Sequence, residues 1–230
     1  MKSANFSRIN CRWVYDSPEF VKFVTTFGTL YGRSLFNLPA PLFSVMPYDP
    51  AQVYQPEADT FLLLAAAQTE VRPGDRVLEI GTGSGSIAAA LVQDCDVVAT
   101  DINPHAVFCA REKGLDVVRD DLCSGLRGTF YLIIFNPPYL PTQLEERIDD
   151  WLEYALDGGA TGRDVIGRFA DAVRGVLAPK GRILLLVSSL TGLSEVVALF
   201  ANRGFTAEVA RQQTVEDEEL CVLRIARKQG

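Results

Sequence analysis

The fold of this chain is decided by the stretch Leu132-Ile133-Ile134-Phe135-Asn136-Pro137-Pro138-Tyr139. Its apolar, β-branched first half predicts a buried strand, and the prolines end that strand because they cannot donate hydrogen bonds to a sheet. The strand therefore delivers the amide side chain of Asn136 to the carboxyl end of a sheet, where open α/β sheets bind their ligands. Because Asn-Pro also starts many ordinary turns, the stretch by itself leaves both interpretations open.

A second strand is predicted at residues 76–80, followed by the glycine-rich turn at residues 81–85 and a helix at residues 87–92. A glycine turn between a strand and a helix is typical of nucleotide sites, because glycine lets a ligand approach the backbone closely. The spacing differs from the dinucleotide pattern, and Glu79 lies two residues before the first glycine. A carboxylate at this place favours a cationic ligand over a pyrophosphate.

Two further predicted strands also end in carboxylates. Asp101 follows residues 97–100 and comes twenty residues after Gly81, the position of an acid that binds ribose hydroxyls. Asp121 and Leu122 follow the strand at residues 116–118 and suit an adenine amino group and the face of its ring. Carboxylates at three successive strand ends indicate a nucleoside-binding edge more strongly than any one of them.

Residues 61–67 predict a helix whose first turn is preceded by acids and Thr60. These groups can cap free backbone N–H groups at the helix start. The alternative interpretation is that Tyr54 and Thr60 form one wall of a ligand pocket.

The order of elements along the rest of the chain predicts an α/β domain. We expect a charged helical stretch at residues 144–152, a flexible glycine loop at residues 158–163 and a helix at residues 164–177. A turn at residues 179–181 should lead into a strand at residues 182–187, and a helix is expected at residues 193–202. The last two strands, residues 206–212 and 220–226, are joined by an acidic loop and should pair as an antiparallel hairpin. Residues 1–51 are predicted to be a partly helical extension of unknown role, and residues 52–230 the main domain.

Composition excludes several classes of protein. The chain has 230 residues, a net charge of −7 and 48% hydrophobic residues, which argues for a folded domain without strong general affinity for nucleic acid. No apolar run reaches the ~18 residues of a membrane span, and the N-terminus lacks the apolar core of a signal peptide. Five scattered cysteines without a CxxC pair indicate reduced thiols in the cytosol and no metal site. The single histidine, His105, makes a hydrolase triad improbable and is expected to cap a helix at the surface.

Three motifs together resemble a known family: residues 79–85, residues 101–104 and the Asn-Pro-Pro-Tyr sequence at residues 136–139. They are similar to those of class I S-adenosylmethionine-dependent methyltransferases. More narrowly, they resemble the HemK group, the protein-glutamine N5-methyltransferases that act on translation release factors. Residues 53–64 and 158–163 look most like the eukaryotic and archaeal branch, whereas residues 1–50 depart from it. The resemblance implies a seven-stranded, mostly parallel Rossmann-like sheet with helices on both faces and a C-terminal antiparallel hairpin.

The same resemblance implies roles for particular residues. Asn136 and the carbonyl of Pro137 would accept hydrogen bonds from the substrate NH₂ group, and Pro138 and Tyr139 would complete the catalytic turn, with the ring against the substrate. The residues expected to contact S-adenosylmethionine, and afterwards its product S-adenosylhomocysteine, are Tyr54, Thr60, Glu79, Gly81, Thr82, Gly83, Gly85, Asp101, Asp121, Leu122 and Asn136.

The function implied by the resemblance is methylation of the glutamine amide in the Gly-Gly-Gln loop of a release factor, in the cytoplasm. The resemblance also implies a small zinc-binding activator protein as partner. Two alternatives stay open at this point. One is an amino-group methyltransferase that acts on nucleic acid or a small molecule, because Asn-Pro-Pro-Tyr also serves such enzymes. The other is a non-catalytic scaffold with the same fold. The exact substrate and the oligomeric state do not follow from the sequence.

Overall fold

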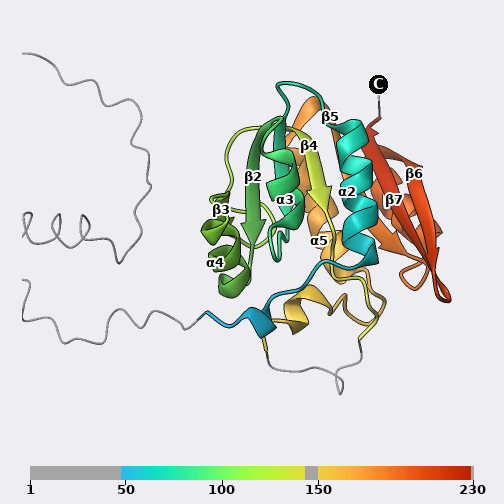
Figure 1. Cartoon of the computed structure of the whole chain (residues 1–230). Helices are drawn as coiled ribbons and strands as arrows, with labels where there is room; N and C mark the ends of the chain where they lie inside the picture. Colours follow the sequence, from blue (N-terminus) through green and yellow to red (C-terminus); the bar gives the residue numbers. More distant parts are fainter. Residues whose placement is uncertain (1–47, 143–149, 229–230) are drawn as a thin grey trace, which may run out of the picture. The chain divides into compact units, whose positions relative to one another are not determined.

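The computed structural model describes residues 48–142 and 150–228 (Figure 1). Most of the partly helical extension predicted at residues 1–51 and most of the stretch at residues 144–152 lie outside these residues. The boundary placed after residue 51 therefore stays a prediction. None of the helices in the described part of the chain is both long and apolar enough for a membrane span.

Seven strands form one sheet in the order β3-β2-β1-β4-β5-β7-β6. Neighbours from β3 to β5 pair in parallel, whereas β7 runs antiparallel to both β5 and β6. This arrangement confirms the predicted mostly parallel sheet with its C-terminal hairpin. The strands are β1 (Arg76–Ile80), β2 (Asp96–Asp101), β3 (Asp116–Arg119), β4 (Phe130–Phe135), β5 (Leu177–Ser188), β6 (Phe205–Val215) and β7 (Glu218–Arg227).

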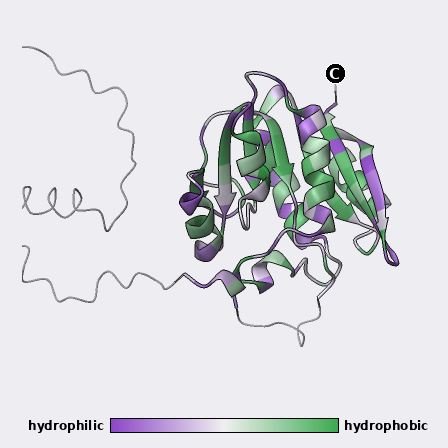
Figure 2. Cartoon of the chain, viewed as in Figure 1, coloured by the Kyte–Doolittle hydropathy of each residue, from purple (hydrophilic) through white to green (hydrophobic). Residues whose placement is uncertain are grey.

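Helices cover both faces of the sheet, because alternate side chains of each strand point to opposite faces. In β4, Leu132 and Ile134 enter one core with α2, α3 and α4, whereas Ile133 and Phe135 enter the other with α5 and α6. Figure 1 shows α2 and α3 in front of the sheet and α5 behind it, and Figure 2 shows the hydrophobic central strands between them. The helices are α2 (Ala58–Glu70), α3 (Ser86–Leu91), α4 (Pro104–Glu112), α5 (Asp164–Ala172) and α6 (Leu193–Ala201), with short 3₁₀ turns at Pro50–Gln52, Glu153–Ala155 and Val173–Gly175.

The strand register brings the predicted motifs to one edge. Ile80 at the end of β1 lies opposite Thr100 in β2 and Phe135 in β4. Gly81, Asp101 and Asn136 directly follow Ile80, Thr100 and Phe135 in the chain. All three therefore lie at the carboxyl edge of the sheet.

Several element boundaries differ from the predictions. The helix expected to continue to residue 177 ends at Ala172 and is followed by a 3₁₀ turn, because β5 already begins at Leu177. The turn expected at residues 179–181 lies inside β5, where the register with β4 shifts. The acidic loop shrinks to the two residues Glu216 and Asp217, since β6 and β7 pair up to Val215 and Glu218.

The glycine loop at residues 158–163 is packed, and the prediction that it is flexible was wrong. Gly158, Gly159 and Gly162 are all buried. The amide of Gly158 donates to the carbonyl of Leu140 at 3.0 Å, and a Cβ on Gly162 would collide with the carbonyl oxygen of Tyr139. Because these glycines have no side chains, the loop can lie directly against the backbone that follows the Asn-Pro-Pro turn.

The expected surface position of His105 was also wrong. Its side chain is 7% exposed, and its Nδ1 accepts a hydrogen bond from the amide of Asp49 at 3.1 Å. The capping role belongs to Asn103, whose side chain accepts from the His105 amide at 2.9 Å. The His105 side chain instead connects α4 to Asp49, near the start of the described chain.

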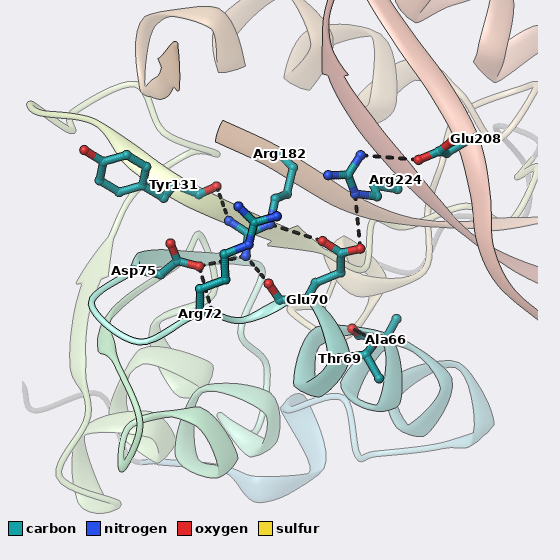
Figure 3. Close-up of polar contacts among 9 residues, drawn as sticks. All are labelled: Ala66, Thr69, Glu70, Arg72, Asp75, Tyr131, Arg182, Glu208 and Arg224. Atoms are coloured by element: carbon teal, nitrogen blue, oxygen red, sulfur yellow. Dashed lines mark hydrogen bonds and ion pairs between the residues drawn. The ribbon is translucent and has the colours of Figure 1, made fainter. Parts of the chain in front are cut away.

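A buried ion network connects the end of α2 to the sheet (Figure 3). The guanidinium of Arg182, a residue only 2% exposed, donates to Glu70 at 3.2 Å, to Asp75 at 2.7 Å and to the carbonyl of Tyr131 at 3.0 Å. Glu70 also accepts from Arg224 at 3.1 Å. Because each buried charge has an opposite partner, the network can hold α2 against β5 and β7.

Candidate active site

A cavity opens at the carboxyl edge of β1, β2 and β4, with further walls from the start of α2 and from residues 154–156 and 165–168. All but one of the predicted site residues line it. They are Tyr54, Thr60, Glu79, Gly81, Thr82, Gly83, Asp101, Asp121, Leu122, Asn136, Pro137, Pro138 and Tyr139. Gly85 does not line the cavity. It is the N-cap residue of α3, with φ of +77°, and a Cβ there would lie 2.9 Å from Leu115, so packing explains the glycine.

Glu79 holds the glycine turn in place. Its buried carboxylate accepts hydrogen bonds from the hydroxyl of Thr82 at 2.7 Å and from the amide of Ala88, in the first turn of α3, at 2.9 Å. Burial raises its pKa to about 8, although the two hydrogen bonds act in the opposite direction. Gly81 and Gly83 have φ of +64° and +52°, a region that favours glycine, and they give the turn its shape.

The second acid, Asp101, is 8% exposed and is bound on both oxygens. One accepts from the amide of Gly83 at 2.8 Å, and the other from the amide of Asn103 at 2.9 Å. Burial raises its pKa, while these backbone hydrogen bonds act in the opposite direction. The tip of β2 is thereby joined to the glycine turn after β1.

The acid that follows β3 is more exposed to solvent than Glu79 and Asp101. The carboxylate of Asp121 pairs with Arg168 of α5, and both side chains are partly exposed. Leu122 has φ of +58°, and its carbonyl accepts from the hydroxyl of Thr100 at 2.8 Å. That hydrogen bond places Leu122 beside the tip of β2.

Charge in the cavity is predominantly negative. Among the described lining residues, Arg168 is the only cation, and five are acids: Asp59, Glu79, Asp101, Asp120 and Asp121. Such a lining attracts a cationic ligand and disfavours a polyanion.

Asp59, expected from the sequence only as an acid that caps a helix start, lies beside Asn136 and Tyr139 in the cavity. It is 3% exposed, and its Oδ2 accepts from Asn136 Nδ2 at 2.9 Å and from the Tyr54 hydroxyl at 3.0 Å. The hydroxyl of Tyr139 is 3.5 Å from the same oxygen. No spacing rule separates a capping acid from one that faces a cavity, so the sequence offered no signal for this role.

The amide oxygen of Asn136 is the one buried acceptor of this cluster without a partner. Its Oδ1 has no hydrogen-bond donor among the described residues, although Nδ2 of the same side chain is bound to Asp59. Most buried polar atoms in native proteins are paired, so an unpaired acceptor in a cavity indicates a place for a ligand donor.

Comparison with known proteins decides the family. The methyltransferase small domain family matches residues 55–149. The putative protein N5-glutamine methyltransferase MJ0928 of Methanocaldococcus jannaschii is 39% identical, over 75% of this chain and 90% of the relative.

This chain belongs to the HemK-like protein N5-glutamine methyltransferase family. Methyltransferase HEMK2 of Homo sapiens is 32% identical to it, over 89% of this chain and 97% of the relative. Among solved structures, the E. cuniculi Mtq2–Trm112 complex, responsible for the methylation of the eRF1 translation termination factor, matches with a TM-score of 0.66. The identity is 31%, over 77% of this chain and 99% of that chain.

Membership of the HemK-like family makes the chain an S-adenosylmethionine-dependent methyltransferase, and the cavity fits that cofactor. A sulfonium carries a positive charge, which the acidic lining complements. The glycine turn after β1 leaves the backbone of Gly81 and Gly83 accessible at the cavity wall. The unpaired Asn136 oxygen lies in the same cavity, so one site can hold both the cofactor and an N–H donor.

Proposed function

We propose that this enzyme methylates the side-chain amide nitrogen of a glutamine in a translation release factor. The observation that carries the proposal is the unpaired, buried Oδ1 of Asn136, which can accept a hydrogen bond from an N–H donor. A glutamine side chain supplies such a donor and carries no charge, so it can enter an acidic cavity without repulsion. The names of the relatives support the same substrate, because they include protein N5-glutamine and release factor glutamine methyltransferases.

The cofactor would be held at the strand ends and the glycine turn. Asp101 is placed for the ribose hydroxyls, and Asp121 with Leu122 for the adenine. Bound there, the cofactor supplies an electrophilic methyl group on a sulfonium. The residues proposed to contact it are Tyr54, Thr60, Glu79, Gly81, Thr82, Gly83, Asp101, Asp121, Leu122 and Asn136.

The Asn-Pro-Pro-Tyr turn would orient the substrate. An amide nitrogen is a poor nucleophile, because its lone pair is delocalised into the carbonyl group. Two fixed acceptors, Asn136 Oδ1 and the Pro137 carbonyl, hold its two N–H groups and stabilise the positive charge that builds up on nitrogen during attack. The N–H proton would become acidic only as the N–C bond forms and the methyl–sulfur bond breaks, so no strong base is required beforehand and the proton would pass to solvent. Tyr139 would pack against the planar amide.

The nucleic-acid alternative finds less support. The lining carries five acids and one arginine, and the whole chain has a net charge of −7. A phosphate backbone would approach this site against repulsion. A scaffold without catalysis is disfavoured because Asn136, Tyr139 and the acidic strand ends converge on one cavity.

A small zinc-binding activator protein is the proposed partner, by analogy with Trm112 in the Mtq2–Trm112 complex. The described sheet has a free edge at β3, where Val118 is 45% exposed. Phe108 of the adjacent α4 is 41% exposed. An exposed apolar edge of this kind supports binding of a partner protein. Methylation of a translation factor would place the enzyme in the cytoplasm.

The test is transfer of a labelled methyl group from S-adenosylmethionine to a purified release factor, with and without the activator. A matched release factor carries glutamate in place of the glutamine of its Gly-Gly-Gln loop. Label in the first factor alone is the expected result. Equal label in both factors, or no label while the cofactor binds, would contradict the proposal.

A further inference from the structure

Asp59 receives three side-chain donors that come from different parts of the chain. Tyr54 precedes α2, Asn136 ends β4, and Tyr139 follows the two prolines. We propose that Asp59 is a positioning residue that holds the amide of Asn136 with its oxygen toward the substrate and thereby selects an N–H donor as the methyl acceptor. The inference rests on the proposed function, because it assigns how that site distinguishes its substrate.

The orientation of Asn136 follows from the chemistry of its neighbour. A carboxylate only accepts hydrogen bonds, so the side of the amide that faces Asp59 at 2.9 Å has to be the NH₂ group. The reversed amide would place its oxygen against the carboxylate oxygen and lose a buried charge-assisted hydrogen bond. Asn136 Oδ1 is consequently left toward the cavity, where no described residue binds it.

The two tyrosines reinforce this arrangement. Burial raises the pKa of Tyr54 and of Tyr139, and the negative charge of Asp59 is the next largest cause of the increase. Both phenols therefore stay protonated and serve as donors. Three donors from Tyr54, Asn136 and Tyr139 around one oxygen compensate for burial of the carboxylate, and they also bring the Tyr139 ring and the Asn136 amide into one unit.

Selection of the substrate follows from the fixed oxygen. An amide NH₂ satisfies Asn136 Oδ1, whereas a carboxylate at the same position would face that oxygen with Asp59 behind it. A site built to bind a donor rejects an analogue that lacks it, because its own buried acceptor is left unpaired. Asp59 should therefore favour glutamine over glutamate without touching either.

The decisive variant is Asp59→Asn, which keeps the shape but can present either NH₂ or oxygen to Asn136. We expect kcat for release factor methylation to fall by about 10- to 100-fold, while the Kd of S-adenosylmethionine rises much less, because the other four acids of the lining remain. In an Asn136→Ala background the same substitution should lower kcat by less than about threefold, since the residue through which Asp59 acts is gone. The matched control is Glu57→Gln, which removes an exposed acid two residues away and should leave kcat unchanged.

An additive effect in the Asn136→Ala background, or equal losses of kcat and cofactor affinity, would show a merely structural role and overturn the inference.

A second readout is the NMR signals of the Asn136 side-chain NH₂ group in ¹⁵N-labelled protein, assigned by their disappearance in Asn136→Ala. Asp59→Asn should shift them, and unchanged signals would overturn the inference even where no substrate is methylated. A native enzyme that binds cofactor but leaves the release factor unlabelled would instead contradict the proposed function. If Asp59→Asn lowers the Tm so far that the variant does not stay folded, Asp59→Glu replaces it. This second variant keeps the charge but displaces the carboxylate, and it should show the same loss of kcat.

Discussion

The carboxylate of Glu79 accepts a hydrogen bond from the backbone amide of Ala88 at 2.9 Å, across the glycine turn between β1 and α3. Glu79 is the last acid before the turn, and Ala88 lies in the first turn of α3, whose free N–H groups attract a carboxylate. The acid that sequence reasoning assigned to the cofactor therefore also holds the loop on which the cofactor would rest.

Burial of Glu79 predicts a pH dependence of stability. Its pKa is raised from 4.5 to about 8, so between these values the native state keeps a proton that the unfolded state has lost. The free energy of unfolding should therefore decrease as pH rises from 4.5 to about 8, by up to about 1.4 kcal/mol per pH unit from this group. Urea unfolding of the native protein and of Glu79→Gln across this range checks it. Parallel pH profiles for the two proteins would refute the prediction.

The same protonation should affect cofactor binding. A cationic ligand binds better to the ionised carboxylate, so affinity for S-adenosylmethionine should increase as pH rises toward about 8 and level off above it. Calorimetry in buffers of different ionisation enthalpy would count the protons released on binding. Glu79→Gln should bind more weakly and lose the pH dependence, and a pH-independent native affinity would speak against the assignment.

Removal of the acceptor amide should separate chemistry from cofactor binding. Asn136→Ala is expected to lower kcat by about 10²- to 10³-fold, the range found when one hydrogen-bond partner of a transition state is deleted. Affinity for S-adenosylmethionine should change much less, because the acids and the glycine turn remain. Turnover and equilibrium cofactor binding measured on the same preparation decide the matter. Comparable losses in both would count against the proposed role.

Loss of the Arg182 guanidinium should strongly destabilise the domain. Arg182→Met leaves Glu70 and Asp75 without this partner in a buried setting, for which a cost of about 3–5 kcal/mol is expected. The control is Arg76→Met, because the Arg76–Asp96 pair has side-chain exposures of 42% and 65% and should contribute at most about 1 kcal/mol. Chemical denaturation compares them, and similar losses in both variants would contradict the inferred role of the network.

The packed glycine loop should tolerate no side chain at residue 162. Gly162 has φ of +70°, and a Cβ there would meet the Tyr139 carbonyl, so Gly162→Ala should displace the Asn-Pro-Pro-Tyr turn and lower kcat. Gly74→Ala tests the effect of the positive φ alone, because φ is +81° and no atom lies near the new Cβ. It should lower the free energy of unfolding by about 1–2 kcal/mol without altering kcat. Gly175→Ala has open space and no positive φ, so it should be neutral. Thermal melts and methyl transfer assays on the three variants test this order.

Much of the fold could be predicted because its signals are local. The strand at residues 132–135, the prolines that end it and the glycine turn after Ile80 each depend on propensities and spacing within a few residues. Parallel strands present their carboxyl ends at one edge, so Glu79, Asp101 and Asn136 could be placed in one site before any contact was known. The structure brings all three to the same cavity.

The rest required contacts between distant residues. Asp59 and Asn136 are 77 positions apart, and Arg182 meets Asp75 across 107 positions, so no pattern in a short window contains either pair. Whether an acid at a helix start caps that helix or faces a cavity depends on which side chains pack over it. Likewise, a glycine loop is flexible in isolation and rigid where a backbone lies against it. The sequence by itself thus determined the sheet, the carboxyl edge at which the cavity lies and the Asn-Pro-Pro-Tyr turn, whereas tertiary packing alone decided which buried charges contact them.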